Sequence, residues 1–240
     1  MKANNSKKTP RKGSRNLAQA ASLRSTLVLA SSAITPAQVA LGFRVKSGRA
    51  IAVVLAGPPE SPQVLARREV KLCDPAEPDS MQPYHAALEM PGQTAAKAIE
   101  RLVKIVRRAA NASVGELIEE WRGAGHEICG AGLVVGSLID PATITNDHIR
   151  AHALEGQLFR VSVQEALVKN GLTSVAIPER DVYLTTATAL GKSEDELKRT
   201  VSELGRALAG PWRADEKTAA LAAWMVLRSS NVQRQIAVRI

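Results

Sequence analysis

The sequence predicts an α/β fold, in which a mixed sheet starts with a β-hairpin and carries helices on both faces. Two segments rich in apolar residues, on either side of the Gly/Pro turn 57-GPPESP-62, predict the hairpin. Two short apolar segments, 128–138 and 172–177, are separated by a long helical segment and are typical of buried parallel strands. Because crossovers between parallel strands are right-handed, this order places helices on both faces of the sheet.

The hairpin strands differ in the exposure that their patterns predict. A first strand is expected from 41–45, ahead of a bend at Gly48. The run 50-AIAVVLA-56 is continuously apolar, as in a buried strand, whereas 63-QVLARREVKL-72 mixes apolar and charged residues like a more exposed one. The three prolines of 74–85 then predict a loop.

Helical periodicity dominates the rest of the chain. A helix is predicted over 94–110, a break at 111–115, and a second helix that ends at 123–125. The Asn-Asp pair at 146–147 can cap a further helix, and the Asn-Gly pair at 170–171 can end it. The remaining predicted helices cover 181–190, 193–209 and 213–228.

The positive charge of the chain is concentrated near its N-terminus. The 240 residues carry a net charge of +9, of which residues 1–40 supply +7, because they contain basic residues and no acid. The remaining chain, 41–240, is close to neutral at +2. We interpret 1–40 as a disordered basic extension, 41–228 as a single α/β domain and 229–240 as a C-terminal tail.

The basic extension allows three interpretations. It could bind phosphates without specificity, serve as an import presequence, or be a solvated arm. Its apolar run, 26–33, is too short to span a membrane. The chain contains two cysteines, Cys73 and Cys129, and therefore has no disulfide framework. This favours a reducing compartment and a cytoplasmic protein.

The segment 214-ADEKTAALAAW-224 begins a predicted helix with acidic residues and continues in alanines. In this feature and in the order of its elements, the stretch 41–228 resembles the ribonuclease H-like fold of resolvase-type and pre-ribosomal-RNA-processing nucleases. The resemblance implies two Mg²⁺ ions, held by acids on the first strand, after the strand that follows the first helix, and at the start of the last helix. Asp215, with Glu216, matches the last position, and Asp140 lies near the second.

The first of these positions carries a basic residue. In 42-GFRVKSG-48, Arg44 stands where the resemblance implies an aspartate. A guanidinium at this place would repel Mg²⁺ and could instead pair with Asp215 or Asp140. We therefore expect a degenerate metal site, with no assured cofactor and with Mg²⁺ as the ion that an intact set of acids would bind.

The helix predicted after residue 146 places three polar residues on one face. At about 100° per residue, His152 lies about 40° to one side of His148 and Glu155 about 20° to the other. This face is opposite the solvent side, so all three side chains are expected to point inward. Each would then need a partner, because an unpaired buried polar group costs about 1–3 kcal/mol.

Two interpretations of these three residues remain open. His152 and Glu155 could belong to an internal hydrogen-bond network, for example between Glu155 and an arginine, while His148 faces the cleft. Alternatively, His148, His152 and Glu155 could bind zinc, since histidines four residues apart on a helix share one face. The sequence lacks the HExxH pattern that would strengthen this alternative.

Further candidates lie where other predicted elements begin or end. Glu179 and Arg180 follow the last strand, at the carboxyl edge where sites form in open α/β sheets. Tyr84 and His85, after the proline-rich loop, could also reach a ligand. The expected site comprises Asp140, Asp215 and His148 as catalytic residues, Arg44, Lys46 and Ser47 on phosphate, and His152, Glu155, Glu179 and Arg180 along the cleft.

Three functions agree with these residues. The first is a domain with a degenerate metal site that binds a phosphate-bearing ligand, above all nucleic acid. The second is an Mg²⁺-dependent nuclease whose acids have moved, with Asp140, Asp215 and either Glu155 or Glu179 as ligands. The third is a non-catalytic structural or protein-interaction domain in which the same residues are internal contacts.

Overall fold

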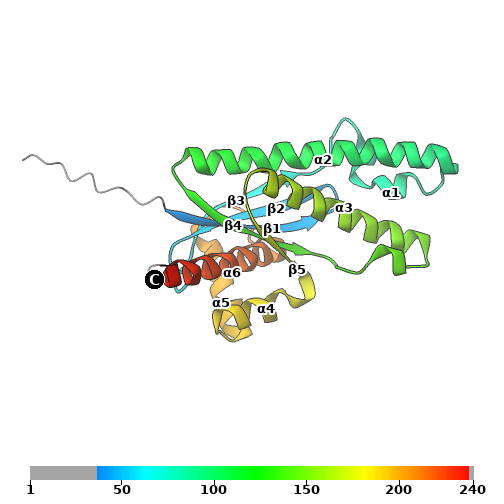
Figure 1. Ribbon diagram of the computed structural model, residues 1–240. Helices are drawn as coiled ribbons and strands as arrows, with labels where there is room; N and C mark the ends of the chain where they lie inside the picture. Colours follow the sequence, from blue (N-terminus) through cyan, green and yellow to red (C-terminus); the bar gives the residue numbers. More distant parts are fainter. Residues whose placement is uncertain (1–36, 238–240) are drawn as a thin grey trace, which may run out of the picture. The chain divides into compact units, whose positions relative to one another are not determined.

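The computed structural model describes residues 37–237 of the chain (Figure 1). The predicted basic extension lies outside the described residues, except for 37–40. Its three interpretations, as a phosphate-binding arm, a presequence or a solvated arm, therefore also fall outside them. Gln38 already belongs to the first strand, so the domain starts slightly earlier than the expected residue 41.

The sheet is mixed and has five strands in the order β3-β2-β1-β4-β5. β1 pairs with β2 and β2 with β3 in antiparallel fashion, as the predicted hairpin requires. β4 pairs in parallel with both β1 and β5. The predicted α/β fold class is therefore confirmed. The strands are β1 (Gln38–Lys46), β2 (Arg49–Ala56), β3 (Gln63–Lys71), β4 (Glu127–Val135) and β5 (Ser174–Pro178).

Helices cover both faces of this sheet, as Figure 1 shows. The long α2 (Gly92–Gly123) and α3 (Asp147–Lys169) lie on one face. The other face carries α4 (Val182–Leu190), α5 (Glu194–Leu204) and α6 (Ala214–Ala237). The short elements are α1 (Pro83–Ala86), η1 (Pro78–Met81), η2 (Pro141–Thr143), η3 (Glu179–Asp181) and η4 (Gly205–Ala207).

Each face of the sheet has its own hydrophobic core, because successive side chains of a strand point to opposite sides. Leu41 and Phe43 of β1 belong to the core under α2 and α3. Ala40, which directly precedes Leu41 in β1, points to the other side. It belongs to the core under α6, together with the fully buried Trp224. The indole Nε1 of Trp224 donates a hydrogen bond to the carbonyl oxygen of Pro59 at 2.7 Å, which ties α6 to the hairpin turn.

Small residues allow α6 to lie directly against the central strands. Gly42 of β1 and Gly132 of β4 are register partners. A Cβ at Gly42 would collide with the carbonyl group of Ala219, and one at Gly132 would lie 2.6 Å from the carbonyl oxygen of Ala222. Four alanines of α6 are fully buried, namely Ala219, Ala220, Ala222 and Ala223. The close approach fixes the start of α6 at the edge of the sheet where β1 ends.

Several helix boundaries differ from the prediction, and two of the differences are described here. The break expected at 111–115 does not occur, and α2 is one continuous helix of 32 residues. Its second half buries Val114, Leu117 and Ile118, so packing outweighs the weak helix propensity of the Asn, Ser and Gly residues, which costs less than about 1 kcal/mol each. α6 continues to Ala237, beyond the expected end at residue 228.

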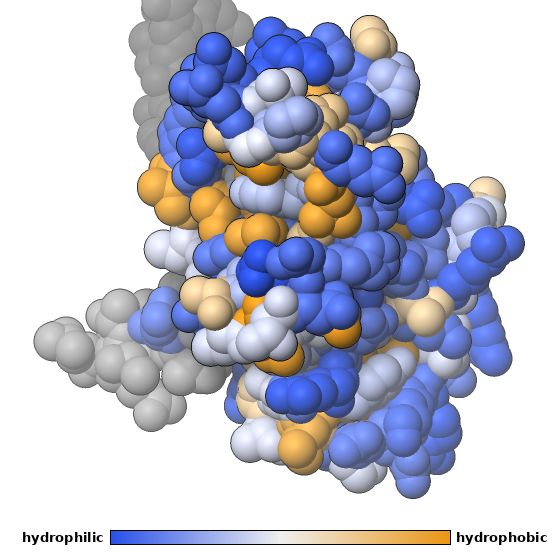
Figure 2. Space-filling view, turned by 90° about the vertical axis from the view of Figure 1, so that its right-hand side faces the viewer, coloured by the Kyte–Doolittle hydropathy of each residue, from blue (hydrophilic) through white to orange (hydrophobic). Residues whose placement is uncertain are grey.

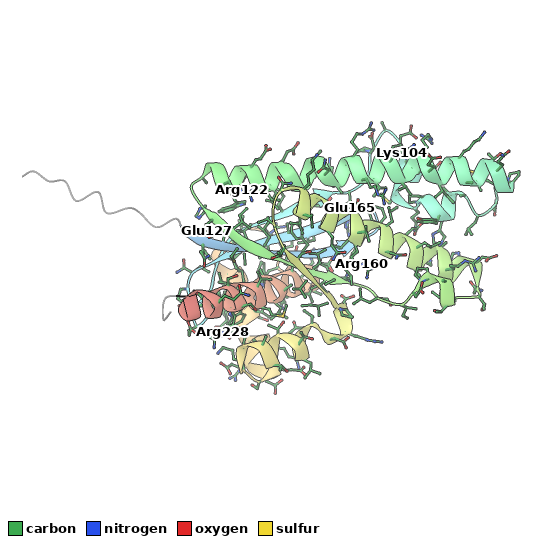
Figure 3. The ribbon with its side chains drawn as sticks, in the orientation of Figure 1. Lys104, Arg122, Glu127, Arg160, Glu165 and Arg228 are labelled. Carbon is green, nitrogen blue, oxygen red and sulfur yellow. The ribbon has the colours of Figure 1, made fainter. Side chains whose placement is uncertain are left out.

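Charged side chains cover the outer surfaces of α2 and α3 (Figure 3). Arg122 donates a hydrogen bond to the carbonyl oxygen of Asn170 at 2.8 Å, and Nε of Arg107 lies 3.3 Å from the Glu165 carboxylate. Both contacts join the two helices, although exposed pairs stabilise a fold by at most about 1 kcal/mol each. The side of the molecule seen in Figure 2 is mostly hydrophilic, with small apolar groups between. Within 37–237 we find no helix with the length and hydropathy that a membrane crossing requires.

Candidate functional site

Three elements bring charged side chains together at one edge of the sheet. β1 and β5 both run parallel to β4, so their carboxyl ends lie at the same edge. Arg44 and Lys46 come from the end of β1, and Glu179 follows β5 as the first residue of η3. Asp215 comes from the first turn of α6. We call these four residues the Arg44 cluster.

Arg44 is the centre of the cluster, and its side chain is only 7% exposed. Its Nη2 donates a hydrogen bond to Glu179 Oε2, and its Nη1 donates one to the carbonyl oxygen of Val45 at 2.8 Å. Its Nε lies 4.0 Å from Asp215 Oδ1, which is too long for a hydrogen bond, so that contact is electrostatic only. Asp215 has a closer partner in Lys46, whose Nζ donates to Oδ2 at 2.7 Å.

The Arg44 cluster contains two cations and two anions and so balances its own charge. Asp215 and Asp140 were the partners expected for Arg44 from the sequence, and Asp215 lies within ion-pair distance. The hydrogen bond of Arg44, however, goes to Glu179, which was not expected as its partner. Asp140 is not among the described ion-pair partners of Arg44. It caps η2, where its Oδ1 accepts a hydrogen bond from the backbone N–H of Ala142 at 3.0 Å.

The other predicted residues at this edge are more exposed. Ser47 lies in the exposed turn between β1 and β2, next to the end of β1. The Arg180 side chain is 82% exposed, and its Nε lies 3.5 Å from Asp181. Lys46 is also exposed, with a side chain that is 40% accessible. Lys46 of the Arg44 cluster, and Arg180 next to Glu179 in the chain, therefore offer cationic groups that a ligand could reach.

A second group of polar side chains lies between α1 and α3. The rings of His85 from α1 and of His148 and His152 from α3 pack against one another, with centroids 4.1–4.8 Å apart. Each residue offers one ligand nitrogen, and these atoms lie within 4.8 Å of one another. Within the described part of the chain, no other group of three His, Cys, Asp or Glu residues is close enough to hold a metal ion. We call these three residues the histidine cluster.

Glu155 lies beneath the histidine cluster and is fully buried. Its Oε1 accepts a hydrogen bond from the backbone N–H of His85 at 3.2 Å and lies 2.8 Å from Nδ1 of the same residue. Glu155 thus has the internal role that the helix face predicted. Its partner, however, is His85 of α1 rather than an arginine.

The helix face predicted the burial of the two α3 histidines incorrectly. Glu155 is buried, but His148 and His152 are exposed although they lie on the same side of α3. The first turns of α3 extend past the sheet (Figure 1), and the short elements α1 and η2 pack against α3. His85 was expected only to reach a ligand, from its place beside Tyr84 after the proline-rich loop, and nothing in the sequence joined it to α3.

Tyr84 lies next to this group and is half-buried. Burial raises the pKa of its phenol, the Arg107 guanidinium opposes the rise, and the Glu155 carboxylate adds to it. The phenol therefore stays protonated at neutral pH.

Comparison with solved structures decides the fold. The structure of RuvC from Thermus thermophilus in complex with a Holliday junction substrate matches with a TM-score of 0.50 and 15% sequence identity, over 81% of this chain and 96% of that one. The chain has the ribonuclease H-like fold. A further structure of the same Thermus thermophilus protein matches with the same values. The yeast mitochondrial Holliday junction resolvase Ydc2 matches with a TM-score of 0.38 and 12% identity, over 85% of this chain and 87% of that one.

The resemblance inferred from the sequence is therefore confirmed at the level of the fold. No family model matches the chain, and no curated protein matches its sequence. Within the ribonuclease H-like fold, Arg44 lies on the first strand and Asp215 at the start of the last helix. The chemistry of this edge must be argued from these residues themselves, because identity of this level indicates the fold alone.

Proposed function

We propose that this domain binds nucleic acid at the edge around the Arg44 cluster and does not cleave it by a two-metal mechanism. The observation that carries this proposal is the buried guanidinium of Arg44, which is hydrogen-bonded to Glu179 and within 4.0 Å of Asp215. The carboxylates at this edge thus already have cationic partners from the protein.

The charge of Arg44 opposes a divalent cation at this place. At an effective dielectric constant of about 20, a divalent ion about 4 Å from a guanidinium is repelled by about 8 kcal/mol. Lys46 adds to this repulsion, because its ammonium group is bonded to the same Asp215. Mg²⁺ binding by Glu179 and Asp215 would first require both ion pairs to break, so we infer that the metal site is degenerate.

Support for nucleic acid as the ligand comes from the fold and from the exposed cations. RuvC from Thermus thermophilus, which has this fold, has been crystallised with a Holliday junction substrate. In the present chain Lys46, at the carboxyl end of β1, and Arg180, just after β5, present partly or largely exposed cations. The hydroxyl group of Ser47 follows Lys46 in the exposed turn. We assign phosphate contacts to these three residues, and to Arg44 the role of neutralising the acids and positioning Lys46 through Asp215.

The nuclease with relocated acids has less support. Asp140 caps η2 with its carboxylate. Glu155, in α3, is buried under the histidine cluster and bonded to His85. Neither carboxylate is part of a described acidic group that could hold a metal ion. The purely structural alternative predicts no nucleic-acid binding at all, and the same binding experiment tests it.

The test measures binding of the full-length chain to a four-way DNA junction and to a duplex, by fluorescence anisotropy over a series of salt concentrations. Each lost phosphate contact lowers the slope of log affinity against log salt by about 0.9, so Lys46→Ala and Arg180→Ala should each reduce it by that amount. Lys104→Ala is the matched control, because Lys104 is an exposed lysine on α2 (Figure 3) with a 72% exposed side chain. The basic extension contributes equally to all of these variants.

Three results would overturn the proposal. Cleavage of the junction that needs Mg²⁺ or Mn²⁺ and disappears in Asp215→Asn would establish a nuclease. Equal salt slopes in the wild-type chain, Lys46→Ala, Arg180→Ala and Lys104→Ala would remove the Arg44 edge from the binding surface. Absence of binding in every form, the wild type included, would leave the structural alternative.

A further inference from the structure

We propose that the histidine cluster is a binding site for Zn²⁺ or a similar transition-metal ion. Its ligands are the imidazole nitrogens of His85, His148 and His152. This inference does not rest on the proposed nucleic-acid binding, since the histidine cluster and the Arg44 cluster share no residue.

The first support is the convergence of three ligands from two elements. His148 and His152 lie one helical turn apart on α3, and His85 reaches them from α1 across 63 or more residues of chain. The three nitrogens lie within 4.8 Å of one another. A tetrahedral zinc ion with bonds of about 2.0–2.1 Å holds its ligand atoms about 3.4 Å apart. The rings therefore need to close by only about 1.4 Å.

The two α3 histidines are able to make this movement. Both are exposed, and in the described part of the chain neither ring forms a hydrogen bond or an ion pair; their contacts are ring to ring. A small change of rotamer at His148 and His152 can thus bring both nitrogens toward His85, which stays in place.

The second support is the way in which Glu155 holds His85. The buried carboxylate lies 2.8 Å from Nδ1 of His85, so Nδ1 carries the proton and donates it to Oε1. The lone pair is then left on Nε2. That atom is inaccessible to solvent and has no hydrogen-bond partner. A carboxylate that orients a histidine in this way is the usual outer shell of a zinc-binding imidazole.

The chemistry of the donors selects the kind of ion. Three neutral imidazoles suit Zn²⁺, Cu²⁺ or Ni²⁺, whereas Mg²⁺ and Ca²⁺ require oxygen ligands. Three protein ligands leave a fourth position for water, and the exposure of His148 and His152 opens that position to solvent. The bound ion would also clamp α1 onto the first turns of α3, where the sheet no longer supports the helix.

The chain provides its own control for this site. It contains four histidines, and the fourth, His126, lies after α2, where its Nδ1 is 3.3 Å from the carbonyl oxygen of Ala37. His126→Ala removes an imidazole without touching the cluster. Glu155→Gln keeps the size of the buried side chain but weakens the polarisation of His85.

The experiment uses the untagged full-length chain, freed of metal with a chelator and without nucleic acid. Zinc is titrated by calorimetry, bound metal is counted by mass spectrometry, and Co²⁺ serves as the spectroscopic probe. We expect one zinc per chain, visible Co²⁺ absorption of the tetrahedral type, and a rise in Tm with zinc. His148→Ala and His152→Ala should each lose most of this binding, Glu155→Gln should weaken it about 10- to 100-fold, and His126→Ala should leave it unchanged.

Several results would overturn the proposal. These are no stoichiometric zinc binding by the wild-type chain, binding that survives in both His148→Ala and His152→Ala, or binding that is lost in His126→Ala. Both α3 variants change exposed side chains and should remain folded, which circular dichroism checks. Loss of nucleic-acid binding with intact zinc uptake, or the converse, would separate this site from the function proposed for the Arg44 edge.

Discussion

Replacing Arg44 with methionine tests whether the Arg44 cluster is an internal ion network that joins the sheet to α6. Methionine keeps much of the apolar stem but removes the charge and the hydrogen bonds to Glu179 and to the carbonyl oxygen of Val45. Glu179, with a side chain that is 44% exposed, can regain water. Asp215 is 22% exposed and keeps its bond to Lys46.

The expected loss follows from these exposures. Removing one partner of a fully buried ion pair costs about 3–5 kcal/mol. Since one carboxylate can be rehydrated and the other keeps a cation, we expect the free energy of unfolding to fall by about 2 kcal/mol. In a domain of this size 1 kcal/mol corresponds to about 2–4 °C, so Tm should fall by about 4–8 °C.

The assay is urea unfolding followed by circular dichroism, with Tm from a thermal scan. Arg49→Met is the matched control: Arg49 is a strand arginine whose side chain is 51% exposed and lies 3.8 Å from Glu69. That substitution should cost less than about 0.5 kcal/mol. If Arg44→Met is no more destabilising than Arg49→Met, the ion network around Arg44 does not stabilise the fold and our reasoning fails.

Three further substitutions test the packing and the second polar group. Gly42→Ala places a methyl group against the carbonyl of Ala219, so the free energy of unfolding, measured with urea, should fall by more than about 3 kcal/mol, or the chain should fail to fold. Gly92→Ala is the control, because that position has open space, and it should be neutral or slightly stabilising. Trp224→Phe leaves the carbonyl oxygen of Pro59 without its donor and should cost about 1–3 kcal/mol, measured by the urea midpoint. Glu155→Ala removes the acceptor of two His85 N–H groups and should cost at least about 2 kcal/mol in the same assay, and a neutral outcome would show that water replaces the carboxylate.

Much of the fold could be predicted from the sequence because its signals are local. Alternation and apolar runs marked the strands, and the turn at 57–62 marked the hairpin. Asn146 accepts a hydrogen bond from the backbone N–H of Ile149, and Ser193 accepts one from that of Glu196, as helix caps should. The break predicted at 111–115 was wrong because local propensity says nothing of the burial that the sheet offers to Val114 and Leu117.

The candidate site was predictable only in part. The resemblance led us to expect Arg44 to pair with Asp215 or Asp140, and the structure brings Asp215 to it. The helix face correctly predicted that Glu155 points inward. The exposure of His148 and His152 was not predictable, since helix periodicity gives the direction of a side chain but not the point at which the sheet beneath it ends.

By itself the sequence determined the order of the elements, the two faces of the sheet and the inward direction of Glu155, because these depend on spacings of a few residues. Only the tertiary structure decided the partners. Glu179 meets Arg44 across 135 residues of chain, and His85 meets Glu155 across 70. Contacts between residues so far apart in the sequence depend on the paths of the crossovers and loops that bring the two segments together. The proline-rich segment that carries His85 to α3 has no periodicity from which its path could be read.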